Sequence, residues 1–131
     1  MIQSRLRSQA ELHLMHYQQT DFIRIIRLSG KFTFETCDQF RDRIVSILDP
    51  SQKAYLLDLS QITHMDSSGI GSIVVFYKTA SKHNSVVSIA NLMTRAKHFF
   101  EIVNLDQIIP TFDELEDAKE YLQTKLEGQK D

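Results

Sequence analysis

A short and almost uninterrupted run of apolar residues, Tyr55–Leu59, constrains the fold of this chain more than any other segment. A strand this apolar is expected in the middle of a sheet, covered on both of its faces. A few residues later, the sequence Asp66–Gly71 (Asp-Ser-Ser-Gly-Ile-Gly) opens a helical pattern of apolar residues, namely Ile70, Ile73, Val74 and Tyr77. Strand, loop and helix in this order predict an α/β domain.

The composition narrows the function classes. A length of 131 residues is enough for one domain, and 42% hydrophobic with 24% charged residues is typical of a soluble globular protein. A formal net charge of −2 gives no electrostatic reason to expect nucleic acid or an anionic membrane as a direct partner. Because the chain has a single cysteine and no apolar stretch that spans a membrane, we expect a cytoplasmic protein without membrane insertion.

Periodicity predicts the remaining elements. The predicted strands are 11–17, 22–28, 55–59, 86–90 and 105–109, and the predicted helices are about 37–47, 67–81, 94–103 and 113–126. Ser29-Gly30 is a turn signal after the second strand, and Pro110 stops the last one. This order predicts a mixed sheet of about five strands with about four helices packed on it. We expect a flexible arm at 1–10, one domain over 11–127 and a tail at 128–131.

The Asp66–Gly71 segment is chemically the most informative one. Backbone N–H groups in the first turn of a helix have no intrahelical partner, and the helix dipole favours negative charge there. A phosphate on Ser67 would be tolerated at such a position. The serines also have an ordinary interpretation, since a serine that caps a helix contributes about 1 kcal/mol. Gly69 and Gly71 lack the Gly-Lys-Ser/Thr ending of a P-loop, and we expect them to admit another backbone, from the core or from a partner.

With these residues in view, the chain resembles the STAS family, especially bacterial anti-sigma factor antagonists, over about residues 11–125. The specific landmark is Tyr55–Leu59 followed by Met65–Gly71. The segment Phe99–Asp106 is similar to a family segment that reads Leu-Phe-x-x-x-Gly-Leu, and Ser29-Gly30 is a weaker match. The resemblance implies a STAS-like α/β fold.

The resemblance also implies a mechanism. In such antagonists the hydroxyl directly after the Asp accepts the phosphate, which points to Ser67, with Ser68 as a secondary candidate. An anti-sigma factor with serine kinase activity binds the unmodified antagonist, phosphorylation releases it, and a PP2C-like phosphatase resets the switch. Because the helix N-terminus stabilises the added charge in the free protein, we expect this release without a large change of fold. The residues expected to meet the partner are Asp66, Ser67, Ser68, Gly69, Ile70, Gly71, Val75 and Thr33.

Two positions depart from the family pattern. Many antagonists have an acidic residue three positions after the early glycine, where this chain has Thr33, near the loop that faces the partner in the family. Asn104 replaces a family glycine, a mild change because asparagine also tolerates the left-handed conformation that follows a helix.

Other interpretations remain open at this level. A permanent STAS subunit of a membrane (ABC-type) transport complex would use the same helix face, with Ser67 as a contact residue. We expect no enzyme, cofactor or metal site, because the five histidines show no ligand spacing and no acid–base or nucleophile–base pair is evident. Cys37 and Phe99–Phe100 are expected in the core, whereas Val75–Phe76 forms either a docking edge or a covered one.

Overall fold

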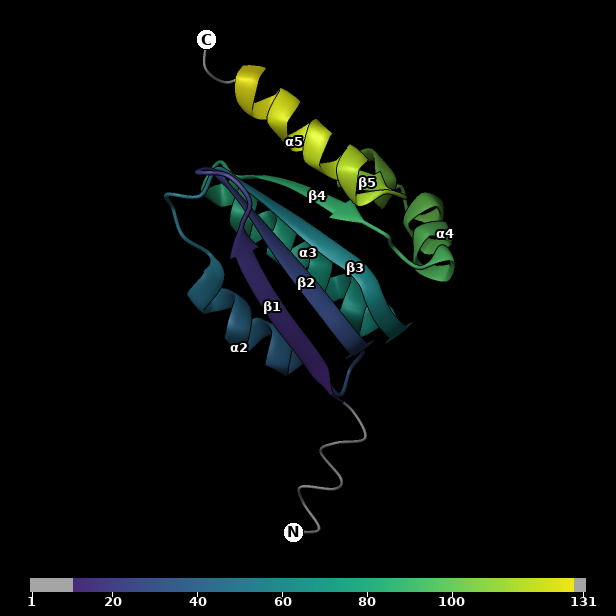
Figure 1. Cartoon of the computed structure of the whole chain (residues 1–131). Coiled ribbons are helices and arrows are strands. Elements are labelled where there is room, and N and C mark those ends of the chain that lie inside the picture. The colour runs from purple at the N-terminus through teal and green to yellow at the C-terminus, as the bar shows by residue number, and fades with distance from the viewer. Residues whose placement is uncertain (1–10, 129–131) are drawn as a thin grey trace.

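The computed structural model describes residues 11–128 and contains a five-stranded sheet with the strand order β1-β2-β3-β4-β5 (Figure 1). Strand β1 pairs antiparallel with β2, and each later neighbour pairs in parallel, so the predicted mixed sheet is confirmed. The strands are β1 (Leu12–Gln18), β2 (Ile23–Phe32), β3 (Ala54–Met65), β4 (Val86–Ala90) and β5 (Thr111–Phe112). The helices are α2 (Cys37–Ile47), α3 (Ser67–Lys82), α4 (Thr94–Ile102) and α5 (Leu115–Gly128), with a 3-10 turn η1 (Leu105–Gln107).

The predicted arm at residues 1–10 and residues 129–131 of the predicted tail lie outside the described residues. Gly128, which was assigned to the tail, is the last residue of α5. No helix within residues 11–128 has the length and apolar character needed to cross a membrane.

The helices are distributed over the sheet as its connections dictate. From β2 onward every connection steps in the same direction across the sheet, and right-handed crossovers then place the linking helices on one face. Figure 1 accordingly shows α2 and α3 behind the strands. Helix α5 follows the last strand, and its residues Ala118 and Leu122 pack on the opposite face.

Two hydrophobic cores result, separated by the sheet. In β3, Tyr55 and Leu57 face the larger core, while Ala54 and Leu56 face the smaller core under α5. All four are at most 1% exposed, as expected for a central strand covered on both faces. The larger core also receives side chains from α2, α3 and α4, including Phe40, Ile44, Ile70, Ile73, Phe76, Ala96 and Phe100.

The predicted turn at Ser29-Gly30 is wrong, because β2 continues to Phe32. Gly30 has a φ of 97° and lies at a register shift between β2 and β3. A Cβ at this position would lie 2.5 Å from the carbonyl oxygen of Glu11, so the glycine serves a close approach inside the sheet.

The predicted strand at 105–109 is also wrong. Residues Leu105–Gln107 form η1, and the short strand β5 comes after Pro110. Asn104, with a φ of 62°, adopts the left-handed conformation that the sequence predicted there, and it turns the chain directly into η1.

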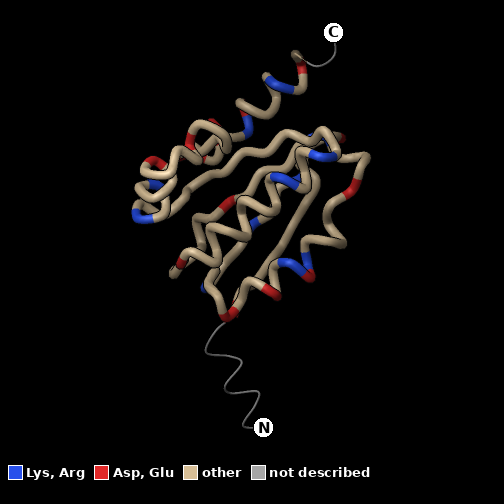
Figure 2. Tube along the Cα trace, turned by 180° about the vertical axis from the view of Figure 1, so that it is seen from behind, with Lys and Arg blue, Asp and Glu red and all other residues tan. Residues whose placement is uncertain are grey.

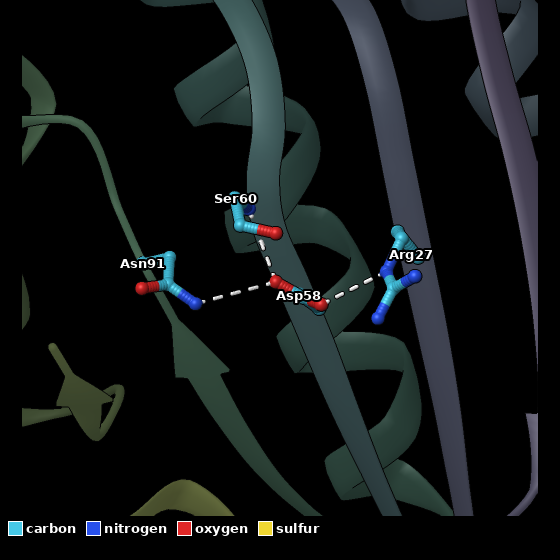
Figure 3. Close-up of polar contacts among 4 residues, drawn as sticks. All are labelled: Arg27, Asp58, Ser60 and Asn91. Atoms are coloured by element: carbon cyan, nitrogen blue, oxygen red, sulfur yellow. Dashed lines mark hydrogen bonds and ion pairs between the residues drawn. The ribbon is translucent and has the colours of Figure 1, made fainter. Parts of the chain in front are cut away.

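An ion pair between the buried Asp58 and the partly exposed Arg27 lies on the α5-facing side of the sheet, shown in Figure 3. The carboxylate of Asp58, 2% exposed, accepts hydrogen bonds from Arg27 Nε at 3.0 Å, the Ser60 backbone N–H at 3.0 Å and Asn91 Nδ2 at 3.4 Å. Burial alone would raise the pKa of Asp58, but the hydrogen bonds from Ser60, Arg27 and Asn91 outweigh it and hold the pKa below its ordinary value.

Candidate functional site

Asp66 connects the start of α3 to the loop between β2 and α2. Its Oδ1 accepts hydrogen bonds from the backbone N–H groups of Ser68 at 2.9 Å and Gly69 at 3.2 Å. Its Oδ2 accepts one from the Phe34 N–H at 3.0 Å. Asp66 is therefore the N-cap of α3, and the capping role considered for the two serines is wrong.

Ser67 is the first residue of α3 and is exposed. Because the aspartate before it satisfies the helix cap, the Ser67 hydroxyl is not needed for that role. Within residues 11–128, no residue forms a hydrogen bond with the Ser67 side chain. The hydroxyl is thus accessible to a modifying enzyme, at the end of a helix where a negative charge is stabilised.

The two glycines of this segment have different environments. Gly69 is buried, and a Cβ there would overlap the carbonyl oxygen of Phe32 and lie 3.0 Å from Met65 Cγ. Gly71 is exposed, and a Cβ there would meet open space. Gly69 therefore admits a backbone from the core, which corrects its assignment to the partner surface. Ile70 is only 9% exposed, so it too lies beneath the predicted partner surface and not on it.

An apolar groove runs between α2 and α3 on one side of Ser67. This α2–α3 groove has a volume of about 370 Å³. Phe34 and Val75 on its rim are 76% and 60% exposed. The groove is lined by Phe34, Cys37, Phe40, Arg41, Ser68, Gly71, Ser72, Val75 and Phe76. Val75 is thus an accessible apolar side chain about two helical turns beyond Ser67 on α3.

The structure decides the position of Phe76 and corrects that of Cys37. Phe76, which the sequence left open as a docking or a covered position, is covered: it is 1% exposed, with its ring centroid 6.2 Å from that of Phe40 and 5.7 Å from that of Tyr55. Helix α3 packs against both the sheet and the neighbouring helix α2, so it buries a wider arc than a single stripe. Cys37 is half-buried at the groove rather than in the core, with its Sγ 3.3 Å from the Phe34 carbonyl oxygen.

Charge near Ser67 is unevenly distributed over the two helices. Helix α2 has four charged residues, whereas α3 has none before Lys78 (Figure 2). On α2, Arg41 lines the groove and forms an exposed ion pair with Asp38 at 2.9 Å. A charge added at Ser67 would therefore change a surface that is otherwise neutral along α3.

A second cavity, which we call the α4 cavity, lies on the other side of Asp66. Its volume is about 660 Å³. It opens where β2 and β3 end and α4 begins, and it is lined by Thr33, Thr63, His64, Met65, Asp66, Met93, Thr94, Arg95 and Ala96. The carboxyl ends of parallel strands are a common place for ligand sites in α/β proteins. Thr33, predicted at the partner surface, lines this cavity and not the groove.

No motif or spacing in the sequence singles out Phe34 or Arg95. Phe34 belongs to a loop held by Thr36, whose hydroxyl donates to the Lys31 carbonyl oxygen at 2.8 Å and accepts from the Thr33 N–H at 3.0 Å. Arg95 is in the first turn of α4, where a positive charge opposes the helix dipole. That unfavourable position is the signal that could have singled out Arg95.

Among residues 11–128, no group of three or more His, Cys, Asp and Glu side chains is placed to hold a metal ion.

Phe100 is fully buried as expected, while the neighbouring Phe99 is 42% exposed.

Comparison with known proteins identifies the family. The family model for the STAS domain matches residues 15–118. The chain belongs to the STAS family. A STAS-domain containing protein of Pseudomonas aeruginosa is 28% identical over 63% of this chain and 81% of its own length. An anti-sigma F factor antagonist of Paenibacillus polymyxa is 27% identical over 68% of this chain and 77% of its own length.

Solved STAS structures have the same fold. An anti-sigma factor antagonist from Mycobacterium paratuberculosis superposes with a TM-score of 0.76 at 18% identity, over 86% of this chain and 95% of the other. A sulfate transporter family protein from Wolinella succinogenes superposes with a TM-score of 0.68 at 16% identity, over 80% and 88%. The STAS fold is thus common to antagonists and to transporter-associated proteins.

Proposed function

We propose that this chain is an anti-sigma factor antagonist that acts by partner switching. In its unmodified form it binds an anti-sigma factor with serine kinase activity. The kinase transfers the γ-phosphoryl group of ATP to Ser67 Oγ, with release of ADP and of the hydroxyl proton, and the modified protein dissociates. A PP2C-like phosphatase hydrolyses the phosphoserine and restores binding. The chain itself contributes binding without catalysis, in the cytoplasm.

The observation that carries this proposal is the exposed and unbonded Ser67 hydroxyl at the start of α3, directly after the capping Asp66. Phosphorylation there adds a charge of about −1.5 to −2 at pH 7. The helix N-terminus stabilises that charge in the free protein. A docked partner would have to accommodate it against a helix that has no charge before Lys78.

The exposed members of the predicted site form the surface we assign to the partner. Asp66, Ser67 and Gly71 are exposed, Ser68 is half-buried, and Val75 continues the surface along α3. Phe34, at the opposite rim of the α2–α3 groove, extends it with a 76% exposed ring. A partner side chain seated in the groove would bury Phe34 and Val75, and apolar area of this kind supplies binding free energy.

Partner capture from host lysate tests the proposal. Wild type, Ser67→Ala and Ser67→Asp serve as baits, and mass spectrometry identifies the bound proteins. We expect a serine-kinase-like regulator on wild type and Ser67→Ala, and its loss on Ser67→Asp. Ser81→Asp, which adds the same charge near the other end of α3, is the matched control and should retain the regulator.

The same experiment addresses the rival function, a permanent STAS subunit of a membrane transport complex. The fold is shared with a sulfate transporter family protein, so fold does not separate the two functions. If all four baits capture a transporter ATPase equally, the contact is constitutive and the switch is excluded. Ser67 would then be one contact residue among several.

A further inference from the structure

The α4 cavity contains an arginine without a counter-ion, Arg95, which is the second residue of α4. Arg95 is exposed and is the one Lys or Arg among the residues that line the cavity. Within residues 11–128, no carboxylate forms an ion pair with it. Its guanidinium group therefore retains its donors for an anion, and its planar fork matches the oxygens of a phosphate.

The backbone of α4 adds donors on the same side. The N-cap residue Met93 provides no side-chain cap, and the first intrahelical bond runs from the Lys97 N–H to the Met93 carbonyl oxygen at 2.8 Å. The N–H groups of Thr94, Arg95 and Ala96 precede that bond, and no described residue accepts from them. Such N–H groups at a helix start favour an anion.

A buried hydroxyl in the cavity wall is also without a partner. Thr33 Oγ1 is inaccessible to solvent and forms no hydrogen bond within residues 11–128. A buried hydroxyl left without a partner carries a desolvation cost. Thr33 comes from the β2–α2 loop, so it and Arg95 approach the cavity from two different segments.

The position of the cavity indicates where such an anion comes from. Asp66 lines the cavity, and Ser67 follows it directly in the chain. The Asp66 carboxylate would repel an anion, but its two oxygens already accept from three backbone N–H groups. On the groove side, Arg41 is already paired with Asp38 at 2.9 Å, and it lies among apolar side chains. A phosphate on Ser67 therefore has more unsatisfied donors on the α4 side.

The geometry points to the α4 cavity as an internal receptor for the phosphate of phosphorylated Ser67, held by Arg95 and the first N–H groups of α4. This inference rests on the proposed phosphorylation of Ser67. A receptor within the chain would stabilise the modified free protein relative to its complex. It would thereby add to the free-energy difference that drives dissociation.

The test uses phosphoserine inserted at position 67 during translation of the full chain, so it needs no native kinase. Phosphorus-31 NMR over pH 4–9 then measures the second pKa of the phosphate, which is about 6 in phosphoserine without a receptor. In the phosphorylated protein with Arg95 intact we expect the phosphate pKa to be lower than in phosphoserine without a receptor. Arg95→Gln should raise it by about 0.5 units or more, because the nearby positive charge is lost. Arg95→Lys keeps the charge but not the planar fork, so its phosphate pKa should lie between that of the parent protein and that of Arg95→Gln.

Matched controls separate the receptor from a general charge effect. Arg41→Gln removes an arginine from the groove side and should leave the phosphate pKa unchanged. His64 and Asp66 also face the cavity, and Lys97 and His98 lie on α4, so all variants are measured again with His64→Gln. Because Arg95 is exposed, its variants should fold, and circular dichroism verifies this.

Two outcomes overturn the inference. Equal phosphate pKa values in Arg95→Gln and the parent protein would show that Arg95 does not hold the phosphate. A shift in Arg41→Gln as large as that in Arg95→Gln would place the phosphate on the groove side or in solvent. Failure of the proposed function would instead appear in the capture experiment, as a partner that binds wild type, Ser67→Ala and Ser67→Asp equally.

Discussion

The two faces of the sheet are built in different ways. Helices α2, α3 and α4 contribute to the core on one face, whereas α5 alone covers the other. Beside the smaller core, Met15 of β1 is 51% exposed, and the buried carboxylate of Asp58 is paired with Arg27. The proposed switch residue, Ser67, belongs to the thickly covered face. The comparison teaches that the proposed site stands on the face with the more extensive apolar core, while polar contacts complete the other face.

Truncation of one large side chain in each core tests this difference most strongly. Phe76→Ala should lower the free energy of unfolding by about 4 kcal/mol, because its ring packs between those of Phe40 and Tyr55. Leu122→Ala, under α5, should lower it by about 2.5 kcal/mol, since a smaller core near an open edge can collapse into the space. Urea unfolding of both variants measures the two losses, and equal losses would contradict the comparison.

A glycine pair within α3 tests how closely that helix approaches the sheet. Gly69→Ala should destabilise the protein by about 3 kcal/mol, because the added methyl group overlaps the Phe32 carbonyl oxygen. Gly71→Ala adds the same group in open space and should stabilise the helix by about 0.5 to 1 kcal/mol. Thermal unfolding distinguishes the two, and a harmless Gly69→Ala would mean that α3 can move away from the end of β2.

The polar contacts on the α5-facing side should respond to loss of their cation. Arg27→Met should cost about 2 kcal/mol at pH 7, because the buried Asp58 carboxylate loses one of its donors and keeps Ser60 and Asn91. Arg41→Met is the matched control. Its ion pair with Asp38 is exposed, so its loss should change stability by less than about 0.5 kcal/mol.

The pH dependence gives this prediction a sign. The pKa of Asp58 is depressed in the folded protein, so its contribution to stability is present above the unfolded pKa and is lost as the pH falls through the folded pKa. The difference between wild type and Arg27→Met should therefore be full at neutral pH, should begin to shrink near the unfolded pKa of about 4, and should be lost below the depressed folded pKa. Urea titrations from pH 2 to pH 7 measure it, and a constant difference would assign the loss to packing.

The smallest expected effect concerns the cap of α3. Asp66→Ala should lower the free energy of unfolding by about 1 kcal/mol, because the N–H groups of Ser68 and Gly69 lose their acceptor. Asp66→Asn keeps one side-chain oxygen and should lose about half as much. Hydrogen exchange at the Phe34 N–H, which Asp66 Oδ2 accepts, then shows whether the cap also orders the β2–α2 loop.

Local pattern predicted most of the fold, and the misses have definite physical causes. The apolar runs identified β3 and β4, and helical spacing identified α2 and α3. Gly30 was taken for a turn, although a glycine inside a strand can serve a bulge and a close neighbour equally well. Phe76 lay outside the predicted core stripe of Ile70, Ile73, Val74 and Tyr77, because one stripe cannot describe a helix that packs against both a sheet and a neighbouring helix.

The site was predictable only as far as it is local in sequence. The acid and hydroxyl at the start of α3 singled out Asp66 and Ser67 as candidate residues, but not that the acid caps the helix. The α2–α3 groove and the α4 cavity each combine side chains from segments far apart in the chain. Thr33 and Arg95 line the same cavity because β2, β3 and β4 pair with one another, and the periodicity of neither segment predicts this.

The strand order has a consequence for how the protein is made. Each strand pairs with the strand before it in the chain, so no strand has to wait for a partner synthesised later. Pairings between consecutive elements close short loops and favour rapid folding. On the ribosome, where the N-terminal part emerges first, β1 and β2 can pair before β3 is complete, and the sheet can grow strand by strand. The start of α3 would then be assembled before α5 exists.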